Sequence, residues 1–489
     1  MEKMIWIPIL FPVLGGLILS RLRGMEQNRT ARQIYIMTVL TAELALVFLF
    51  MQQKGSALRV FPLVDQIPVY FRIDEISMLF SGLIAVIWWL SGLFALEYMK
   101  HEGHERSYFV FYLIAEGVLT GISYAGNLVT LYLCFECMTL LTMPFVLHAR
   151  TRKSVRAARK YMFYSIFGAS MSLGGIVILA IYAPSIAFQP GGVFTAEVFG
   201  QHQTLYLCAA GLMIVGFCGK AGLFPLHGWL PTAHPQAPAP ASAVMSGIIT
   251  KMGVLTSIRV AFYIFGADYL RGTWVQTLWM TLAVLTIFMG SMMAYKEPSM
   301  KRRFAYSTVS QVSYILLGLA SMTAEGMTGG LLHVVFHAVS KTTLFLMSGA
   351  VIYYTGKKKV RELDGIGRQM SAVILCYTIA SAALVGIPPL SGFVSKEFLA
   401  HGVMEAGIPI LNLLAPVVLL ISAVLTAGYL FPITIHGYFP EKGEESYETI
   451  SIDGKMLIPL LILGVLSVIL GICPGRLITF AEQISELLL

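Results

Sequence analysis

The feature that most constrains the fold is a series of long apolar stretches that recurs along the whole chain. Each stretch runs for roughly 17–25 residues, enough for an α-helix to cross the hydrocarbon core of a bilayer. We count fourteen of them, centred near residues 12, 42, 87, 116, 137, 172, 214, 252, 283, 314, 341, 387, 420 and 464. Only 12% of the 489 residues are charged, against about 25% in an ordinary soluble domain. The sequence therefore predicts an all-α, polytopic membrane protein in which residues 1–489 form a single transmembrane domain.

Basic residues gather on one side of the predicted spans. With fourteen spans and both termini outside, one side holds 23 of the 34 lysines and arginines, the other side holds 6, and 5 lie inside spans. Because basic loops are typical of the cytoplasmic side, the loops at 148–160, 296–303 and 356–368 are predicted to be cytoplasmic. The net charge of +8 is thereby attributed to topology, and no nucleic-acid partner is expected. The first apolar run lacks a signal-peptide cleavage site and is predicted to remain as a span in the plasma (inner) membrane.

Motifs for soluble chemistry are missing from the sequence. Cys134 and Cys137 form a C-x-x-C pair, but the pair lies inside a predicted span and has no second pair elsewhere, so we interpret it as helix packing. Walker A, G-x-G-x-x-G and HExxH patterns are absent. We therefore predict no ATP hydrolysis, no cofactor, no metal site and no catalytic redox centre in this chain.

Two predicted spans contain helix-breaking residues. Span seven runs into a segment with five prolines between residues 225 and 240, and span twelve is interrupted by "GIPPLSGF" at 386–393. Non-helical backbone at membrane depth is tolerated where it is buried in protein or lines a wet cavity, and paired breaks indicate a transport path. Since the breaks are five spans apart, spans 4–8 (residues 108–265) and 9–13 (residues 274–435) are candidate inverted repeats.

Titratable side chains lie near the middle of several spans. A lysine at the centre of a span costs about 2.5–3.5 kcal/mol, so its retention indicates a function. In span eleven the histidines and the lysine are spaced i, i+4, i+8 and share one helix face. Lysine has a pKa that its environment can adjust, and histidine titrates near neutrality. These titratable side chains, called the row below, predict a proton path through the membrane. The row is formed by Glu136, Lys220, Lys251, His333, His337, Lys341 and Lys396.

The stretch "PLHGWLPTAHPQAPAPASAVMSGIITKMG" resembles the signature of an antiporter-like family of membrane subunits. That family includes the large membrane subunits of respiratory complex I, the Mrp-type Na⁺/H⁺ antiporters and the energy-converting membrane hydrogenases. The stretches "NLVTLYLCFE", "HVVFHAVSKTTLFLMSG" and "GIPPLSGFVSKEFL" match its other segments, over about residues 70–435. The resemblance implies fourteen spans, two inverted five-helix repeats and a hydrated polar axis. It also implies an ion pair between Glu136 and Lys220, a central Lys251, and an exit near Lys396.

Partners and ions follow from the same resemblance. It implies other membrane subunits, a peripheral redox arm, and H⁺ as the transported ion with Na⁺ as a further candidate. The early end after span fourteen and Lys396, where some complex I relatives have glutamate, favour an Mrp-type or hydrogenase-type subunit. A self-sufficient Na⁺/H⁺ antiporter is the alternative function, and a silent structural subunit is disfavoured because the titratable row is retained.

Five further residues stay open to two readings or carry a separate prediction. Glu43 and Glu116 either meet a neighbouring subunit or form hydrogen-bonded packing. His227 and His234 either line an access path or bond the freed carbonyls of the broken span. Arg259 is predicted to be an anchor that reaches the membrane interface.

Overall fold

The computed structural model describes residues 4–22, 24, 28–64, 67–194, 202–440 and 448–489. Lys3, Arg23 and Lys442, which count in the charge bias, lie outside the described residues.

The first helices are α1 (Ile7–Arg21), α3 (Arg29–Met51), α4 (Glu75–Glu102), α5 (Glu105–Tyr124), α6 (Leu128–Leu147), α7 (Arg152–Tyr182) and α8 (Gln203–Ala221). The next segments are η2 (Leu226–Trp229), α9 (Leu230–Ala233), α10 (Ala239–Val244), η3 (Met245–Ile249), α11 (Thr250–Ile258), η4 (Arg259–Phe265) and α12 (Ala267–Leu270). The last are α13 (Trp274–Lys296), α14 (Met300–Ser321), α15 (Ala324–Thr355), η5 (Val360–Glu362), α16 (Ile366–Gln369), α17 (Ser371–Val385), α18 (Ser391–Met404), α19 (Pro409–Tyr438), α20 (Gly454–Ile472) and α21 (Gly475–Leu488).

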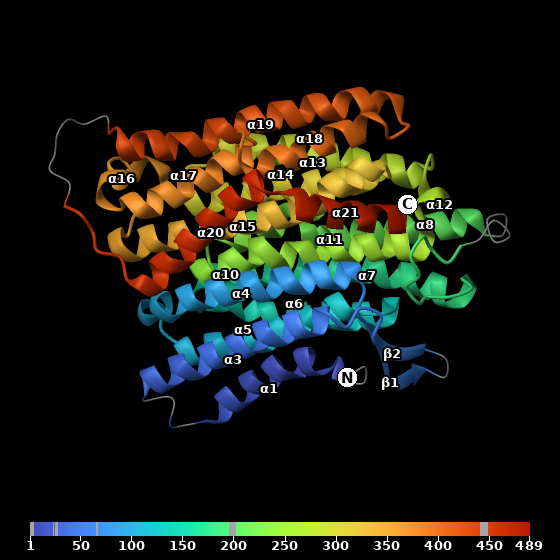
Figure 1. Cartoon of the computed structure of the whole chain (residues 1–489), viewed down its shortest axis with the longest axis horizontal. Helices are drawn as coiled ribbons and strands as arrows, with labels where there is room; N and C mark the ends of the chain where they lie inside the picture. The colour runs from blue at the N-terminus through green and yellow to red at the C-terminus, as the bar shows by residue number, and fades with distance from the viewer. Residues whose placement is uncertain (1–3, 23, 25–27, 65–66, 195–201, 441–447) are drawn as a thin grey trace.

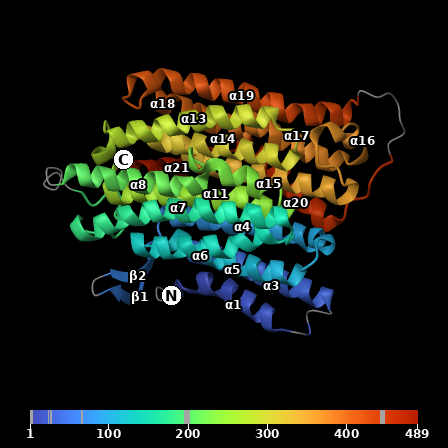
Figure 2. The ribbon, with the colours of Figure 1, turned by 180° about the vertical axis from the view of Figure 1, so that it is seen from behind.

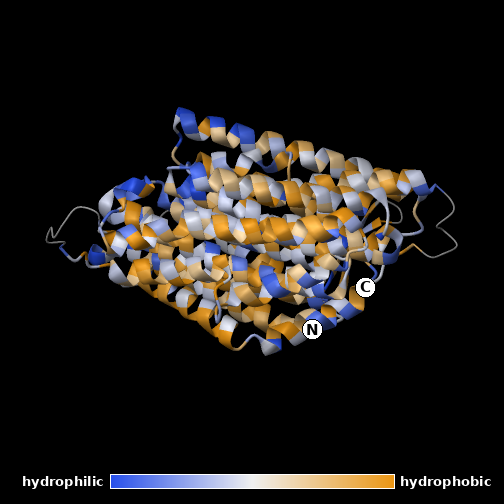
Figure 3. Ribbon diagram, turned by 90° about the horizontal axis from the view of Figure 1, so that it is seen from above, coloured by the Kyte–Doolittle hydropathy of each residue, from blue (hydrophilic) through white to orange (hydrophobic). Residues whose placement is uncertain are grey.

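The long helices lie side by side in a bundle whose two edges are formed by different parts of the chain. Helices α1 and α3 form one edge and α19 the other, and the views from front and back agree on this order (Figures 1 and 2). Hydrophilic residues gather toward the ends of the helices, while hydrophobic residues dominate their long sides (Figure 3). Among the described residues, 11 helices are long and apolar enough to cross a membrane. The outer helices expose large apolar side chains, such as Leu413 at 75% and Leu420 at 68% on α19, as expected for contact with lipid or another membrane helix.

Side-chain caps at several helix starts explain where those helices begin. The side chain of Asn127 accepts a hydrogen bond from the amide of Thr130 at the start of α6, and Thr151 does the same for Ser154 at the start of α7. Such caps satisfy amides that have no partner within the helix. The Asn127 cap fixes where α6 begins after α5, the Thr151 cap fixes where α7 begins after α6, and together they set the depth of Glu136 in the bundle.

A small β-hairpin is an element that the all-α prediction missed. Strands β1 (Ala57–Val64) and β2 (Ile67–Arg72) pair antiparallel, with Ala57 opposite Arg72. The hairpin is attached to the bundle at Gly126, whose amide donates to the carbonyl of Tyr70, and at Asn127, whose side chain donates to the carbonyl of Pro68. The sequence does not predict the hairpin, because its strands are short and contain proline, which is unusual in strands, and because helical periodicity dominates the rest of the chain.

Both predicted helix breaks are present, and they have the same local structure. Helix α8 ends at Gly222 with φ +94°, and α17 ends at Gly386 with φ +93°. The next amide in each case bonds back into the helix, from Leu223 to Cys218 and from Ile387 to Ala382. This is the Schellman ending that a left-handed glycine allows. The sequences "GLFPLHG" and "GIPPLSG" at the two breaks match in their glycines, proline and leucine.

The three basic loops that were predicted to be cytoplasmic meet at one end of the bundle. The amide of Met300 donates to the carbonyl of Lys358, and the amide of Val360 donates to the carbonyl of Pro298. Lys153, Lys301 and Lys358 line one common cavity. Their clustering is what the charge bias predicts for loops on one side of a membrane.

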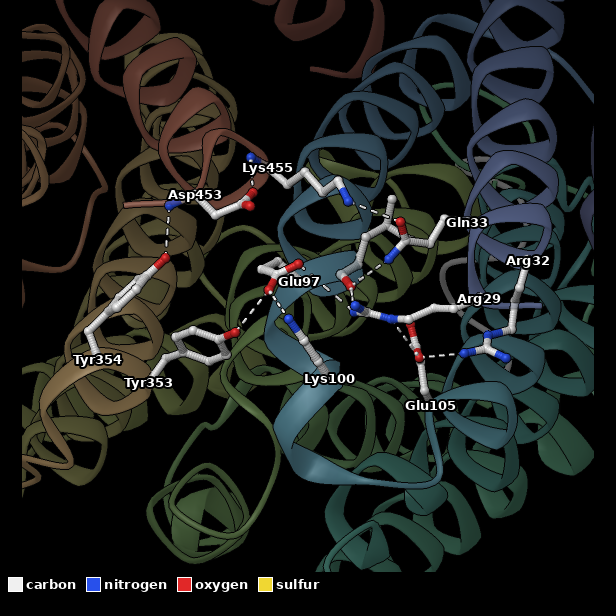
Figure 4. A network of polar contacts seen from close by, with 11 residues as sticks. Arg29, Arg32, Gln33, Glu97, Lys100, Glu105, Tyr353, Tyr354, Asp453 and Lys455 are labelled. Carbon is white, nitrogen blue, oxygen red and sulfur yellow. Dashed lines mark hydrogen bonds and ion pairs between the residues drawn. The ribbon is translucent and has the colours of Figure 1, made fainter. Parts of the chain in front are cut away.

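A polar network at this end ties the early helices to the late ones (Figure 4). Arg29 and Arg32 of α3 both contact Glu105 of α5, and Glu97 of α4 accepts a hydrogen bond from Tyr353 of α15. Lys455, at the start of α20, donates to Gln33 of α3 at 3.0 Å. Segments far apart in sequence are therefore held at the same height along the bundle axis. The contact of Tyr353 with Glu97 also fixes the height of α15 beside the early helices.

Cysteine labelling tests the predicted topology. Lys153→Cys and Gln189→Cys place thiols at the two ends of α7, whose 31 residues span roughly 46 Å. We expect an impermeant thiol reagent applied from outside to label residue 189 and not residue 153, and the reverse in inside-out vesicles. The chain with its six native cysteines alone is the background control. Labelling of both positions from one side would overturn the fourteen-span topology.

Candidate functional site

Lys220, near the end of α8, lies in a cage of hydroxyl groups and aromatic rings. Its Nζ donates to Thr139 Oγ1 at 3.0 Å, Tyr161 Oη at 2.6 Å and Ser165 Oγ at 3.1 Å. The rings of Tyr161, Trp229 and Phe135 also lie within cation–π range. The side chain is 3% exposed. All three donors of the ammonium group are thus satisfied by neutral partners.

Glu136 of α6 does not complete the ion pair that the resemblance implies. Among the described residues, no ion pair within 4 Å joins it to Lys220, and its Oε1 is buried without a hydrogen-bond partner. The expected contact is therefore wrong for this conformation. The physical reason is that the hydroxyls on α6 and α7 already satisfy the lysine. The two charges remain near enough to interact electrostatically.

Helix α11 carries Lys251 and packs backbone to backbone against α8. Gly253 permits this, because a Cβ there would lie 2.5 Å from the amide nitrogen of Ala221 and 2.8 Å from the carbonyl oxygen of Phe217. Lys251 itself is fully buried. Its Nζ donates to the carbonyl of Ser246 at 2.7 Å, a carbonyl in the π-helical segment η3 just before α11. The irregular turn thus provides a backbone acceptor for a buried cation.

The histidine face of α15 meets Lys251 directly. Lys251 Nζ lies 2.5 Å from His337 Nδ1, so α11 and α15 are joined by a polar contact at the centre of the bundle. His333 lies one turn away, with its ring centroid 5.9 Å from that of His337. It bonds Ser395 of α18 through Nδ1 at 2.9 Å and Gln311 of α14 through Nε2 at 3.2 Å. His337 Nε2 is buried and has no hydrogen-bond partner among the described residues.

Lys341 and Lys396 are each held by neutral groups. Lys341 Nζ donates to Ser307 Oγ at 2.5 Å, and Ser307 lies 2.6 Å from Tyr429 Oη of α19. Lys396 Nζ donates to the carbonyls of Leu384 and Val385, the last residues of α17 before the break. It therefore satisfies the freed end of the broken helix. The ring of Tyr314 lies 5.1 Å from Lys396 Nζ and stacks on His333 with centroids 5.7 Å apart.

A cavity of about 720 Å³ opens at the basic end of the bundle, beside the broken span seven. Its polar and charged lining residues include Glu102, Arg152, Lys153, Gln236, Lys301 and Lys358. At its inner side Lys301, which is 8% exposed, donates to the carbonyl of Ala237 at 2.8 Å. The cavity thus reaches the proline-rich segment that contains His234.

His234 is fully buried, and neither ring nitrogen has a hydrogen-bond partner in the described part of the chain. Its ring stacks on Phe345 of α15, with centroids 4.7 Å apart. Bonding of freed carbonyls, one of the two readings left open by the sequence, is therefore wrong for His234. His227 is partly buried and its Nδ1 also lacks a partner there, so its role stays a prediction.

Arg259 is not an interfacial anchor. Its side chain is 1% exposed and makes two hydrogen bonds to Asp74, at 2.5 and 2.8 Å, and one to Ser77 at 3.1 Å. The ring of Tyr263 lies 4.4 Å away. The prediction is wrong because a position near the end of a span does not by itself give access to the interface: Asp74 pairs with Arg259 and holds it inside the bundle. The sequence does contain a signal for this pair: Asp74 is an acid at the start of one span and Arg259 is a base inside another, and charges within a membrane usually pair with one another.

Several polar groups of the site were not predicted. They are uncharged polar side chains that contact the titratable residues of the row, directly or through one another. These are Thr139, Tyr161, Ser165, Ser307, Gln311, Tyr314, Ser395 and Tyr429. A single hydroxyl or amide in an apolar helix is common and carries no periodic signal. Cys134 and Cys137 are both free thiols; Cys134 lies against Gly121 of α5, whereas Cys137 is exposed, so its interpretation as a packing residue stays a prediction.

Comparisons with known proteins show the family and the fold of the chain. A family described as "NADH:quinone oxidoreductase/Mrp antiporter, TM" matches residues 125–440, and one described as "NADH-Ubiquinone oxidoreductase (complex I), chain 5 N-terminus" matches residues 64–109. NADH-quinone oxidoreductase subunit N of Desulforudis audaxviator is 30% identical over 427 residues, which are 83% of each chain. A Na⁺/H⁺ antiporter subunit of Alkalihalophilus pseudofirmus is 26% identical over 494 residues, covering 100% of this chain and 98% of that one. A chain of the membrane-bound sulfane sulfur reductase, an archaeal respiratory membrane complex, has the same fold, with a TM-score of 0.87 at 23% identity and full coverage of both chains.

The protein is thus a multi-pass integral membrane protein with the antiporter-like fold. It belongs to the NADH:quinone oxidoreductase/Mrp antiporter family of membrane proteins, which confirms the resemblance inferred from its motifs.

The Asp74–Arg259 pair gives a prediction on stability. We expect Asp74→Asn and Arg259→Gln each to destabilise the protein by about 3–5 kcal/mol, because each leaves a buried charge without its partner. The double change Asp74→Asn/Arg259→Met should recover most of the loss, since an asparagine at position 74 keeps the helix cap and no charge remains. Thermal unfolding in detergent measures the effect.

The matched control is Asp268→Asn, which breaks the exposed ion pair with Arg271 and should cost less than about 1 kcal/mol. Equal melting temperatures for Asp74→Asn and Asp268→Asn would contradict a stabilising role for the buried pair.

Proposed function

We propose that this chain is the proton-translocating membrane subunit of a multisubunit ion-pumping complex. The observation that carries the proposal is the buried chain of side chains from Lys251 through His337 and His333 to Lys396. Its links lie on α11, α15 and α18, three helices that the bundle packs together. An apolar core has no structural need for such a chain, and each member is costly to bury.

The part of the row from Lys251 to Lys396 supports proton transfer by its contacts. His337 has one nitrogen against Lys251 and one without a partner among the described residues, so it can accept a proton at one face and release it at the other. His333 continues toward Ser395 and Tyr314, which lie beside Lys396. Lys396 sits at the broken end of α17 and bonds its freed carbonyls, and a break of this kind at membrane depth is typical of the lining of a wet cavity.

The part of the row formed by Glu136 and Lys220 supports a switch. A carboxylate beside a buried lysine stabilises the ammonium form, and separation of the two favours release of the proton. In this structure Glu136 and Lys220 are separate, and the hydroxyl cage holds the lysine. Lys220 lies directly before the break at Gly222, so a movement of the broken segment changes its surroundings. We infer that closing and opening of this pair drives the proton toward Lys251.

The cavity at the basic end is the access route that this proposal assigns to the proton. It ends at Lys301 and the proline-rich segment, which contains His234, and the ring of His234 stacks on Phe345 of α15, the helix that carries His333, His337 and Lys341. A buried histidine whose two nitrogens lack partners among the described residues suits a relay between water in the cavity and the row.

The architecture proposed for the chain is fourteen spans with two inverted repeats, at residues 108–265 and 274–435. The matching glycine-capped breaks at Gly222 and Gly386 support this arrangement. Helix at thirteen of the fourteen predicted centres supports it as well, and the remaining centre, residue 387, lies in the break between α17 and α18. The clustering of basic loops supports a cytoplasmic side at that end, with both termini outside.

Partner subunits are proposed to supply the energy. Two relatives carry the names of subunits of an NADH-quinone oxidoreductase and of a Na⁺/H⁺ antiporter. We propose that this chain likewise works beside other membrane subunits, driven either by a peripheral redox arm or by a coupled Na⁺ gradient.

Charge changes at Glu136 and Lys220 test the switch. We expect Glu136→Gln and Lys220→Ala each to assemble normally and to lower proton transport in vesicles by roughly tenfold or more, because a one-unit change in proton affinity already corresponds to about 1.36 kcal/mol. The double change Glu136→Gln/Lys220→Met, which leaves no unpaired charge, should stay inactive. Transport is followed with a pH-sensitive dye, and assembly by native electrophoresis.

Glu486→Gln and Lys296→Ala are the controls, because both side chains are exposed and lie outside the row. Recovery of transport in the double variant would mean that the pair merely joins two helices, and would overturn the switch.

A further inference from the structure

Two buried acids lie outside the row. Glu43 of α3 is 0% exposed and Glu116 of α5 is 1% exposed. None of their four carboxyl oxygens has a hydrogen-bond partner among the described residues. Hydrogen-bonded packing, one of the two readings that the sequence left open, is therefore wrong for both.

The packing of three helices places the two acids at the same level. Gly92 of α4 lies against both Leu40 of α3 and Tyr112 of α5, since a Cβ there would be 2.6 Å from Leu40 Cδ1 and 3.4 Å from Tyr112 Cε1. Glu43 follows Leu40 by three residues and Glu116 follows Tyr112 by four, so each is one turn further along the same helix face. Helices α3 and α5 both run antiparallel to α4, so both steps go in the same direction. The charges of the two carboxyls interact accordingly.

Two hydroxyl groups near the acids also lack partners. Ser91 Oγ, on the residue before Gly92, and Tyr124 Oη of α5 are buried without a hydrogen-bond partner within the described ranges. Tyr124 interacts electrostatically with Glu43, and Tyr112, which faces Ser91, interacts with Glu116. Ser81 lies near Tyr124, and Tyr112 lies near Ser91, so each hydroxyl has one neighbouring hydroxyl and room for a further polar partner.

No base among the described residues pairs with either acid. Between its ends α1 has no titratable side chain, and neither has the stretch of α4 from residue 76 to 96. The ends of these two helices carry Arg21 on α1 and Glu75, Glu97, Tyr98, Lys100, His101 and Glu102 on α4. The titratable groups on the other helices packed here are Arg29, Arg32 and Tyr35 on α3, Glu105, Arg106, Tyr108, Tyr112 and Tyr124 on α5, Tyr132, Cys134, Glu136 and Cys137 on α6, and Lys251 on α11. Arg29 and Arg32 contact Glu105, and Lys251 bonds His337. Two adjacent buried carboxylates cannot both stay ionised without a cation.

We propose that Glu43 and Glu116 form a second proton-binding site, in which the two carboxyl groups share one proton. The bound proton lets one carboxyl donate a hydrogen bond to the other, and rotation of the Ser91 and Tyr124 hydroxyls toward the acids would let them donate to the oxygens that remain. The site lies where α3, α4 and α5 meet, and α5 packs in turn against α6, which carries Glu136 (Figure 1). It would extend the titratable row toward the edge at which a neighbouring membrane subunit can dock.

Labelling with dicyclohexylcarbodiimide tests this site. The apolar reagent adds to a protonated carboxyl group within the membrane to give a stable acylurea, which peptide mass spectrometry locates. In the full chain in its native complex we expect label on Glu43 or Glu116 near neutral pH, and loss of label as the pH rises. Exchange of K⁺ for Na⁺ at constant pH should leave the labelling unchanged. Exposed Glu486 is the internal control and should stay unlabelled.

Sharing of the proton is tested by removing one acid. Glu43→Gln removes the negative charge that holds the proton on Glu116, so labelling of Glu116 should fall at a pH lower by about one unit or more. Glu116→Gln should shift the labelling of Glu43 in the same direction. An unshifted profile in both variants would show that no proton is shared.

Two results in the unaltered protein overturn the site without any variant. The first is absence of label on both acids at every pH. The second is protection by Na⁺ at constant pH, which would assign the acids to a sodium ion instead. Because neither arm measures transport, the outcome is independent of the proposed function.

Discussion

The structure depends on one constraint: a charged side chain in the interior of this bundle has to find its polar partners inside the protein. Three of the four lysines of the row meet this constraint in different ways. Lys220 uses three hydroxyls and aromatic rings, Lys251 uses a π-helical carbonyl and a histidine, and Lys396 uses the freed carbonyls of a broken helix. These partners come from several helices, so the polar contacts of the lysines form only when the helices of the bundle pack together.

Neutral partners have a consequence for function that ion pairs would not have. A lysine locked to a carboxylate is difficult to discharge, whereas one held by hydroxyls and carbonyls can lose its proton and still keep hydrogen bonds. The one buried pair of opposite charges described close to the row, Asp74 with Arg259, has an arginine, which stays charged in proteins. The chain therefore separates a fixed charge pair that stabilises the fold from adjustable charges that suit proton movement.

The sequence predicted what depends on local spacing. The i, i+4, i+8 pattern places His333, His337 and Lys341 on one helix, and the structure has all three buried on α15. The prolines and glycines predicted both helix breaks, because their backbone limits act within a few residues. The lengths of the apolar runs predicted where the helices lie.

What depends on contacts between distant segments was not predicted. The contact of His337 with Lys251 requires the register of α15 against α11, which no local pattern reports. Arg259 was misplaced because its partner, Asp74, lies 185 residues earlier in the chain. The sequence does not predict the hydroxyl cage of Lys220, because Thr139, Tyr161 and Ser165 contact the lysine only when α6, α7 and α8 pack together.

The central claim is that protons pass along the row through His337. Its most direct measurement compares His337→Ala with His333→Ala in the assembled complex, reconstituted in vesicles and followed by a pH-sensitive dye. His333 is flanked by Ser395 and Gln311, which can hold water in the space of its ring, whereas His337 makes the contact with Lys251 itself. The account predicts that both variants assemble and that His337→Ala loses much more transport than His333→Ala. Transport at the unaltered rate by a fully assembled His337→Ala complex would contradict it.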